Sequence, residues 1–106
     1  MQLHITQAGA DTIVAVHASR LDASIAPQFK TDMMEIINGG ARRIVLDMSA
    51  VKLIDSSGLG TLVSLLKSLN GQGSIVIRGP SPTVLGLFKL TRMDRVFTIE
   101  STPATV

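Results

Sequence analysis

The sequence predicts a single α/β domain in which helices pack on one mostly parallel sheet. Short β-branched runs alternate with amphipathic segments of helical length. The chain has 106 residues, of which 45% are hydrophobic, so it can bury one core without a disulfide or a structural metal. The predicted order is β-β-α-β-α-β-α-β, with residues 1–106 forming one domain.

The chain opens with a predicted hairpin. Residues Leu3–Thr6 and Thr12–Ala18 are rich in β-forming residues, and Gln7–Asp11 between them is a turn-forming cluster. The second run is nearly continuous in apolar residues, which is typical of a central strand. We expect His17, at its end, to be a hydrogen-bonded structural residue, and its spacing indicates no partnership with His4.

A helix follows the hairpin. Its predicted cap is Asp22 or Ser24, and Pro27 falls in its first turn, where proline is tolerated. The glycines after Asn38 end the helix. Its expected buried stripe is Phe29, Met33, Ile36 and Ile37.

The central part of the chain predicts a strand and then a second helix. Arg43–Met48 is short and β-branched, as in an interior strand. The amphipathic segment that begins at Leu59 ends at Asn70–Gly73, where two glycines interrupt it. One face of that segment carries Leu59, Leu62, Val63, Leu66 and Leu69.

The last third predicts a strand, a helix and a final strand. Ser74–Arg78 forms the first of these strands, and Ser81 caps a third helix with Pro82 at its first position. Val96–Ile99 is the final strand. The tail that follows contains Pro103 and is too short for a long helix.

Composition and charge exclude several classes of function. The chain has no cysteine, which removes thiolate catalysis and cysteine-ligated zinc. Ten basic and eight acidic residues are scattered, and there is no Trp or Tyr to stack on bases, so we expect no direct nucleic-acid binding. The sequence shows no signal peptide and no membrane-spanning stretch, and we therefore expect a cytoplasmic protein that does not bind a membrane.

Known catalytic motifs are also missing from the sequence. It has no nucleophile elbow, no phosphate-binding loop and no His, Asp and Glu set with metal-ligand spacing, so we expect no catalytic residue, no metal and no cofactor. Asp47 ends a predicted strand, as the phosphoryl-accepting Asp of a receiver domain does. The acidic pair and the lysine that complete a receiver site are absent, and Asp47 is expected to bond to the backbone of the following loop.

The stretch Leu53–Gly60 carries the polar groups that these exclusions leave unexplained. It joins a predicted strand to the second helix and contains Asp55, Ser56 and Ser57. Asp and Ser side chains accept hydrogen bonds from the free N–H groups of a first helical turn, so Asp55 and Ser57 are expected to build the helix start. A plain helix cap is one interpretation, and an exposed functional hydroxyl at Ser56 is the other.

The motif residues Val45–Ser49, Ile54–Gly60 and Arg20–Asp22, in this order of elements, resemble the STAS domain family, and specifically the bacterial anti-sigma factor antagonists. The resemblance implies that Ser56 is phosphorylated by an anti-sigma factor that is itself a serine kinase. Two departures are Ser19, where a glycine is common, and a tail shorter than the terminal helix of many relatives. The implied partner-binding residues are Asp22, Asp55, Ser56, Ser57, Gly58, Leu59 and Gly60.

The leading hypothesis from the sequence is a non-enzymatic switch. The unphosphorylated protein would bind the kinase and free a sigma factor, phosphorylation of Ser56 would end that binding, and a serine phosphatase would restore it. A second hypothesis is a structural STAS subunit that docks on a transporter ATPase without phosphorylation. A third is a phosphate-handling activity that uses Asp47 or Asp55.

Overall fold

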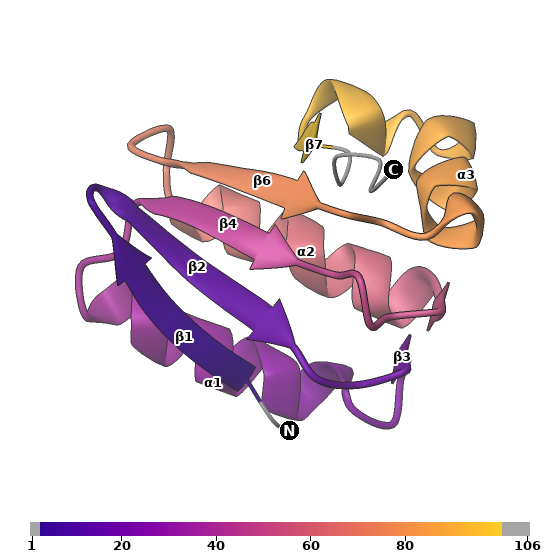
Figure 1. The fold of residues 1–106 in the computed structure, drawn as a ribbon, viewed down its shortest axis with the longest axis horizontal. Helices are drawn as coiled ribbons and strands as arrows, with labels where there is room; N and C mark the ends of the chain where they lie inside the picture. The colour runs from indigo at the N-terminus through magenta and orange to yellow at the C-terminus, as the bar shows by residue number, and fades with distance from the viewer. Residues whose placement is uncertain (1–2, 101–106) are drawn as a thin grey trace, which may run out of the picture.

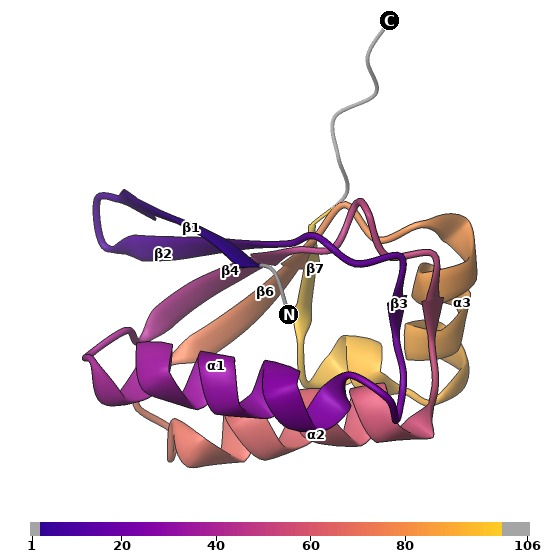
Figure 2. The same ribbon diagram turned by 90° about the horizontal axis from the view of Figure 1, so that it is seen from below.

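A five-stranded sheet forms the centre of the fold, and two long helices cover one of its faces in the computed structural model (Figures 1 and 2). The structure describes residues 3–100. The strand order is β1-β2-β4-β6-β7; β1 is antiparallel to β2, and every later pair is parallel. The strands are β1 Leu3–Ala8, β2 Asp11–Val16, β4 Arg43–Asp47, β6 Ser74–Arg78 and β7 Thr98–Glu100. The predicted α/β class and mostly parallel sheet are confirmed.

The three helices alternate with the strands of the main sheet in the order that the sequence predicts. The 13-residue helices α1 (Ala26–Asn38) and α2 (Ser56–Ser68) pack side by side beneath the sheet, as Figure 2 shows. The third helix, α3 (Pro82–Leu90), stands at the end of the sheet and is followed by a short 3₁₀ turn, η1 (Met93–Arg95). A parallel strand pair needs a crossover, and each of these helices supplies one.

The core lies between the sheet and the helices. Alternate residues of β2, β4 and β6 point toward the helices, as the period of two along a strand requires. Phe88 and Phe97 meet edge to face with ring centroids 5.9 Å apart, which fastens α3 to the segment before β7. The fully buried side chains include Phe29, Met33, Leu46, Leu62, Leu65 and Ile77.

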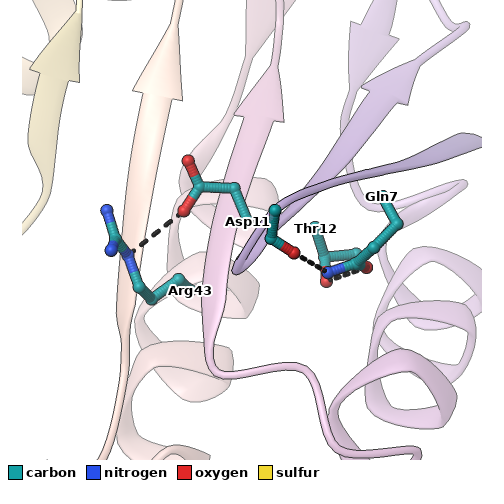
Figure 3. A network of polar contacts seen from close by, with 5 residues as sticks. Gln7, Asp11, Thr12 and Arg43 are labelled. Carbon is teal, nitrogen blue, oxygen red and sulfur yellow. Dashed lines mark hydrogen bonds and ion pairs between the residues drawn. The ribbon is translucent and has the colours of Figure 1, made fainter.

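The opening hairpin is confirmed, and its turn is held by a small polar network (Figure 3). Gly9 has φ +61°, as the first central residue of a tight hairpin turn requires. Among the described residues, Thr12 is the only polar residue that is buried. Its hydroxyl donates to Gln7 Oε1 at 2.9 Å. An exposed ion pair, Asp11 to Arg43 at 3.1 Å, joins the hairpin to β4.

The expected lack of relation between His4 and His17 is wrong. Their rings stack with centroids 6.2 Å apart, and both side chains are exposed. The hairpin register pairs His4 with Ala15, two residues before His17, so both rings lie on the face of the sheet opposite α1 and α2. Spacing along the sequence could not reveal this contact because strand register creates it.

The predicted cap of the first helix is also wrong. The N-cap residue is Ile25, which makes no side-chain cap bond, and the helix begins at Ala26 with Pro27 in its first turn as expected. Asp22 and Ser24 form a turn that precedes the helix. The Asp22 carboxylate accepts from the Ser24 N–H, and the Asp22 carbonyl accepts from the N–H of Ala26 at 2.8 Å. This Asx-type turn delays the helix.

Other boundaries shift by a few residues. The second helix begins at Ser56, three residues before Leu59, and its buried stripe follows Gly58, Leu62, Leu65 and Leu69, so Leu65 was missed. The final strand starts at Thr98 because the N–H groups of Val96 and Phe97 donate back to the Met93 carbonyl, in the turn that ends η1. The cap of α3 is confirmed, since Ser81 Oγ accepts from the Val84 N–H at 3.2 Å. The tail with Pro103 lies outside the described residues.

Two leucines test whether burial against the sheet holds the fold together. Leu62 of α2 is fully buried, whereas Leu90 of α3 is 81% exposed. We expect Leu62→Ala to lower the free energy of unfolding by about 2–5 kcal/mol, and Leu90→Ala to change it by less than about 0.5 kcal/mol. Urea denaturation measures both. Equal losses in the two variants would contradict the placement of α2 against the core.

Candidate functional site

A two-stranded parallel sheet, which the sequence did not predict, positions the residues around Asp55. Strand β3 (Arg20–Leu21) pairs with β5 (Leu53–Ile54), and the pair stands apart from the main sheet at the end where α2 begins (Figure 2). The loop before β5 is anchored by buried Met48 and Val51. Each strand has only two residues, too few to give a periodic signal.

The carboxylate of Asp55 joins the two segments of this junction. Its Oδ1 accepts from the Gly58 N–H at 2.9 Å, which caps α2 as predicted. Its Oδ2 accepts from the Ala23 N–H at 3.1 Å, in the segment after β3. The Asp55 N–H also donates to the Leu21 carbonyl at 3.3 Å. One side chain therefore fixes both the start of the helix and the loop beside it.

Gly58 lies where the two segments touch. A β-carbon at this position would overlap the Leu21 carbonyl oxygen and would lie 2.9 Å from Ile54 Cγ1. Glycine is therefore required by the close approach of two backbones. Gly58 is buried at the start of α2, and its expected role as a partner contact stays a prediction. Gly60 has open space around it and remains exposed.

The two hydroxyls of the motif are both exposed. Ser56 is the first residue of α2 and Ser57 the second. The expectation that Ser57 helps to cap the helix is wrong, because the capping oxygen belongs to Asp55, one residue outside the helix. Ser56 directly follows that cap, so its hydroxyl is presented to solvent from a position that the backbone holds firmly.

Asp22 borders the same surface and is partly exposed. Its Oδ1 accepts from the Ser24 hydroxyl at 2.5 Å and from the Ser24 N–H at 3.1 Å. These hydrogen bonds, the hydroxyl bond first, and the positive charge of Arg20 hold the pKa of the Asp22 carboxyl below its ordinary value. The carboxylate is therefore ionised at neutral pH, and the surface around Ser56 carries negative charge from Asp22 and Asp55.

An exposed leucine completes this surface. The side chain of Leu53 is 53% exposed and helps to line a hollow of about 320 Å³ together with Arg20, Asp22, Ile54 and Asp55. Leu53 is not among the site residues that the sequence predicts. The alternation of strand side chains could have found it, because Ile54 packs against the core and its neighbour must then point outward.

Asp47 behaves as the sequence predicts. Its Oδ1 accepts from the Ser49 N–H at 3.0 Å, in the loop after β4. Within residues 3–100, no group of three or more His, Cys, Asp or Glu side chains is arranged to hold a metal ion. None of the helices in that part of the chain is both long and apolar enough to span a membrane.

Comparison with known protein families identifies the family of this fold. The model of the STAS domain matches residues 3–106. The chain belongs to the STAS domain family. The strand pair β3–β5 and the capped start of α2 are therefore parts of a STAS domain, and the resemblance inferred from the motif residues is confirmed.

Relatives by sequence carry the name anti-sigma factor antagonist. A candidate anti-sigma factor antagonist from Thermotoga maritima is 32% identical over 94 residues, which cover 87% of this chain and 83% of the relative. The crystal structure of a candidate anti-sigma factor antagonist from Thermotoga maritima superposes on this STAS domain with a TM-score of 0.83 at 28% identity, over 95% of this chain and 87% of that chain. The anti-sigma-B factor antagonist of Listeria monocytogenes is 30% identical over 104 residues, covering 95% and 90%.

The fold also matches structures of SpoIIAA in an unphosphorylated and a phosphorylated form. The anti-sigma factor antagonist SpoIIAA in its unphosphorylated form gives a TM-score of 0.76 at 19% identity, covering 94% of this chain and 89% of that chain. The phosphorylated form of SpoIIAA from Bacillus gives 0.69 at 18% identity, covering 94% and 92%. At these identities the match concerns the fold alone.

The close approach at Gly58 predicts a large difference between two glycines of α2. Gly58→Ala should lower the free energy of unfolding by several kcal/mol, because the new methyl group overlaps backbone that cannot move without breaking the β3–β5 pair. Gly60→Ala is the matched control and should stabilise the protein by about 0.5–1 kcal/mol through helix propensity. Thermal unfolding compares them, and a Gly58→Ala protein as stable as the wild type would contradict this contact.

The hydrogen bonds to Asp22 predict that the protein becomes less stable as the pH falls. Because its pKa is lowered in the folded protein, Asp22 contributes stability at neutral pH that is lost as the pH falls through the folded pKa. Ser24→Ala should raise the pKa of Asp22 toward its ordinary value, and Ser57→Ala should leave it unchanged. Carboxyl ¹³C NMR titration measures this pKa. An unchanged midpoint in Ser24→Ala would show that the hydroxyl is not its main cause.

Proposed function

We propose that this STAS domain is an anti-sigma factor antagonist whose partner, a serine-kinase anti-sigma factor, binds the surface around Ser56. The unphosphorylated protein holds the kinase and so frees a sigma factor. The kinase phosphorylates Ser56 and the complex separates, and a serine phosphatase resets the protein. These reactions would take place in the cytoplasm.

The observation that carries the proposal is the exposed Ser56 hydroxyl at the first residue of a 13-residue helix. Asp55 supplies the cap, so Ser56 is not needed to hold the helix. The group is thus accessible to a kinase and dispensable for the fold. The sequence relatives from Thermotoga and Listeria support the proposal through their names, and SpoIIAA supports it because that antagonist exists in both phosphorylated and unphosphorylated forms.

The folded domain should tolerate a phosphate on Ser56. The phosphate brings about −1.5 to −2 charges. It arrives at a helix N-terminus, where free N–H groups and the helix dipole favour an anion by about 0.3–1 kcal/mol. Asp55 and Asp22 oppose this gain with like charge, but both are solvated and screened. The balance is small compared with the stability of a domain, so modification leaves the fold intact.

In the complex with a partner, the same charge is no longer exposed to water. Docking removes water from the surface, and the phosphate and the Asp55 carboxylate must then be desolvated next to each other. A penalty of about 4 kcal/mol is within the range for buried unpaired charge. Since about 1.4 kcal/mol is a factor of ten, the complex should weaken roughly a thousandfold.

The proposed contact surface extends beyond the motif. It includes Asp22, Asp55, Ser56 and Ser57, with the half-buried Leu59 and exposed Gly60 on the first turns of α2. Leu53 adds an exposed apolar group next to them. An apolar side chain inside a polar rim is the usual composition of an energetic centre in an interface.

Substitution of Ser56 separates phosphorylation from binding. Ser56→Ala should bind the kinase with wild-type affinity and accept no phosphate at this position. Ser56→Asp should bind about tenfold or more weakly, because one charge imitates part of the phosphate effect. Calorimetry with the purified kinase measures affinity, and mass spectrometry locates the phosphate.

The neighbouring hydroxyl provides the control. Ser57→Ala should be phosphorylated and should bind as the wild type does. Wild-type affinity in both Ser56 variants, or a phosphate found on Ser57 instead, would contradict the proposal. A protein that is never phosphorylated but still binds through this surface would favour the structural docking role.

A further inference from the structure

The outer edge of β1 is open along its whole length. Strand β1 is the first strand of the sheet and pairs only with β2 among residues 3–100 (Figure 1). The two strands pair residue for residue over six positions without a bulge, and β1 contains no proline, lysine or arginine. Proteins commonly protect an edge strand with a bulge, a proline or a charged side chain such as lysine. This edge is therefore able to receive another strand.

The hairpin register identifies which backbone groups point outward. Ala8 and Asp11 flank a two-residue turn and form a hydrogen-bonded pair. Hydrogen-bonded and non-hydrogen-bonded pairs alternate along an antiparallel ladder, so His4 and Thr6 also bond to β2. The N–H and C=O groups of Leu3, Ile5 and Gln7 then face away from the sheet.

A groove runs beside these outward groups. It lies between β1 and α1, encloses about 360 Å³, and is lined by Leu3, Ile5, Asp32, Glu35 and Ile36. Its floor is apolar: Ile5 is 52% exposed, and Leu3 and Ile36 are half-buried. No residue of the Ser56 surface contributes to it.

The rim of the groove carries negative charge. Asp32 and Glu35 stand one turn apart on the β1 side of α1, and the residues between 3 and 100 that line the groove include no cation. Asp32 Oδ1 accepts from Gln28 Nε2 at 2.8 Å, which holds the carboxylate at the rim. A second copy of this chain, paired edge to edge, would bring its own Asp32 and Glu35 toward these two. Like charge therefore disfavours a dimer through β1.

We propose that the β1 edge and this groove bind an extended, basic segment of another protein, which adds a sixth strand to the sheet. The backbone of the segment pairs with Leu3, Ile5 and Gln7, as in other cases of strand addition. One apolar side chain of the segment packs between Ile5 and Ile36. Lysine or arginine side chains two residues to either side reach Asp32 and Glu35.

Two synthetic heptapeptides test this surface on the full chain. The probe is Thr-Lys-Thr-Val-Thr-Lys-Thr, which places two lysines and a valine on one side of a strand, and its matched control has glutamate in place of both lysines. NMR titration should show at least tenfold tighter binding of the lysine peptide at low salt. The amides of Ile5 and Gln7 should then exchange more slowly with solvent, while those of His4 and Thr6 change little because β2 already bonds them.

Charge reversal on α1 checks the chemistry of the rim. The double variant Asp32→Lys and Glu35→Lys should reverse the preference between the two peptides, and Asp94→Lys, an exposed change in η1, should preserve it. Ile5→Pro removes an outward N–H and should abolish binding of the lysine peptide. Both helix substitutions leave the core unchanged, so they remain informative if Ile5→Pro fails to fold.

Four results would overturn the proposal. Equal response to both peptides would remove the role of Asp32 and Glu35. No response to either would show that the edge is closed to added strands, and shifts confined to the surface around Ser56 would place the binding elsewhere. Slower exchange at Ile5 on raising protein concentration without peptide would identify a second copy of the chain as the occupant.

Discussion

The hydrogen bonds of the Asp55 carboxylate organise the end of this domain at which α2 begins. One oxygen caps α2 at Gly58 and the other holds the N–H of Ala23, so a single side chain ties the helix start to the segment after β3. Gly58 allows this closure because its missing side chain leaves room for the Leu21 carbonyl. In the Asp-Ser-Ser-Gly pattern, Asp55 and Gly58 thus meet a geometric requirement, neither serine caps the helix, and Ser56 directly follows the capping residue.

Under the proposed function, this division of labour would allow one surface to be both stable and switchable. A hydroxyl that caps a helix cannot accept a bulky anion without loosening the fold, whereas Ser56 lies one residue beyond the cap and stays exposed. The free-energy cost of a charge added at Ser56 falls mainly on the complex with a partner that covers this surface. The edge of β1 lies on different elements and carries no residue of this surface, so its proposed strand partner would be indifferent to the state of Ser56.

Local patterns predicted most of this fold, and long-range pairing accounts for what they missed. The strand runs, the helix faces and the caps at Asp55 and Ser81 follow from residue type and spacing. The β3–β5 pair and the His4–His17 stack depend on which distant segments meet, and no window of sequence contains that information. Two other misses are local: β5, which contains Leu53, has only two residues and gives a weak periodic signal, and the chain at Asp22 and Ser24 makes one turn before the first helix starts.

In the proposed switch, a charge on Ser56 acts on the partner and leaves the domain folded. The most direct measurement uses protein phosphorylated stoichiometrically on Ser56 and records its melting temperature and its affinity for the kinase in parallel. The account predicts a melting temperature within a few degrees of the unmodified protein, together with a loss of affinity of roughly a thousandfold. A phosphoprotein that melts far below the unmodified form, or one that binds the kinase equally well, would contradict it.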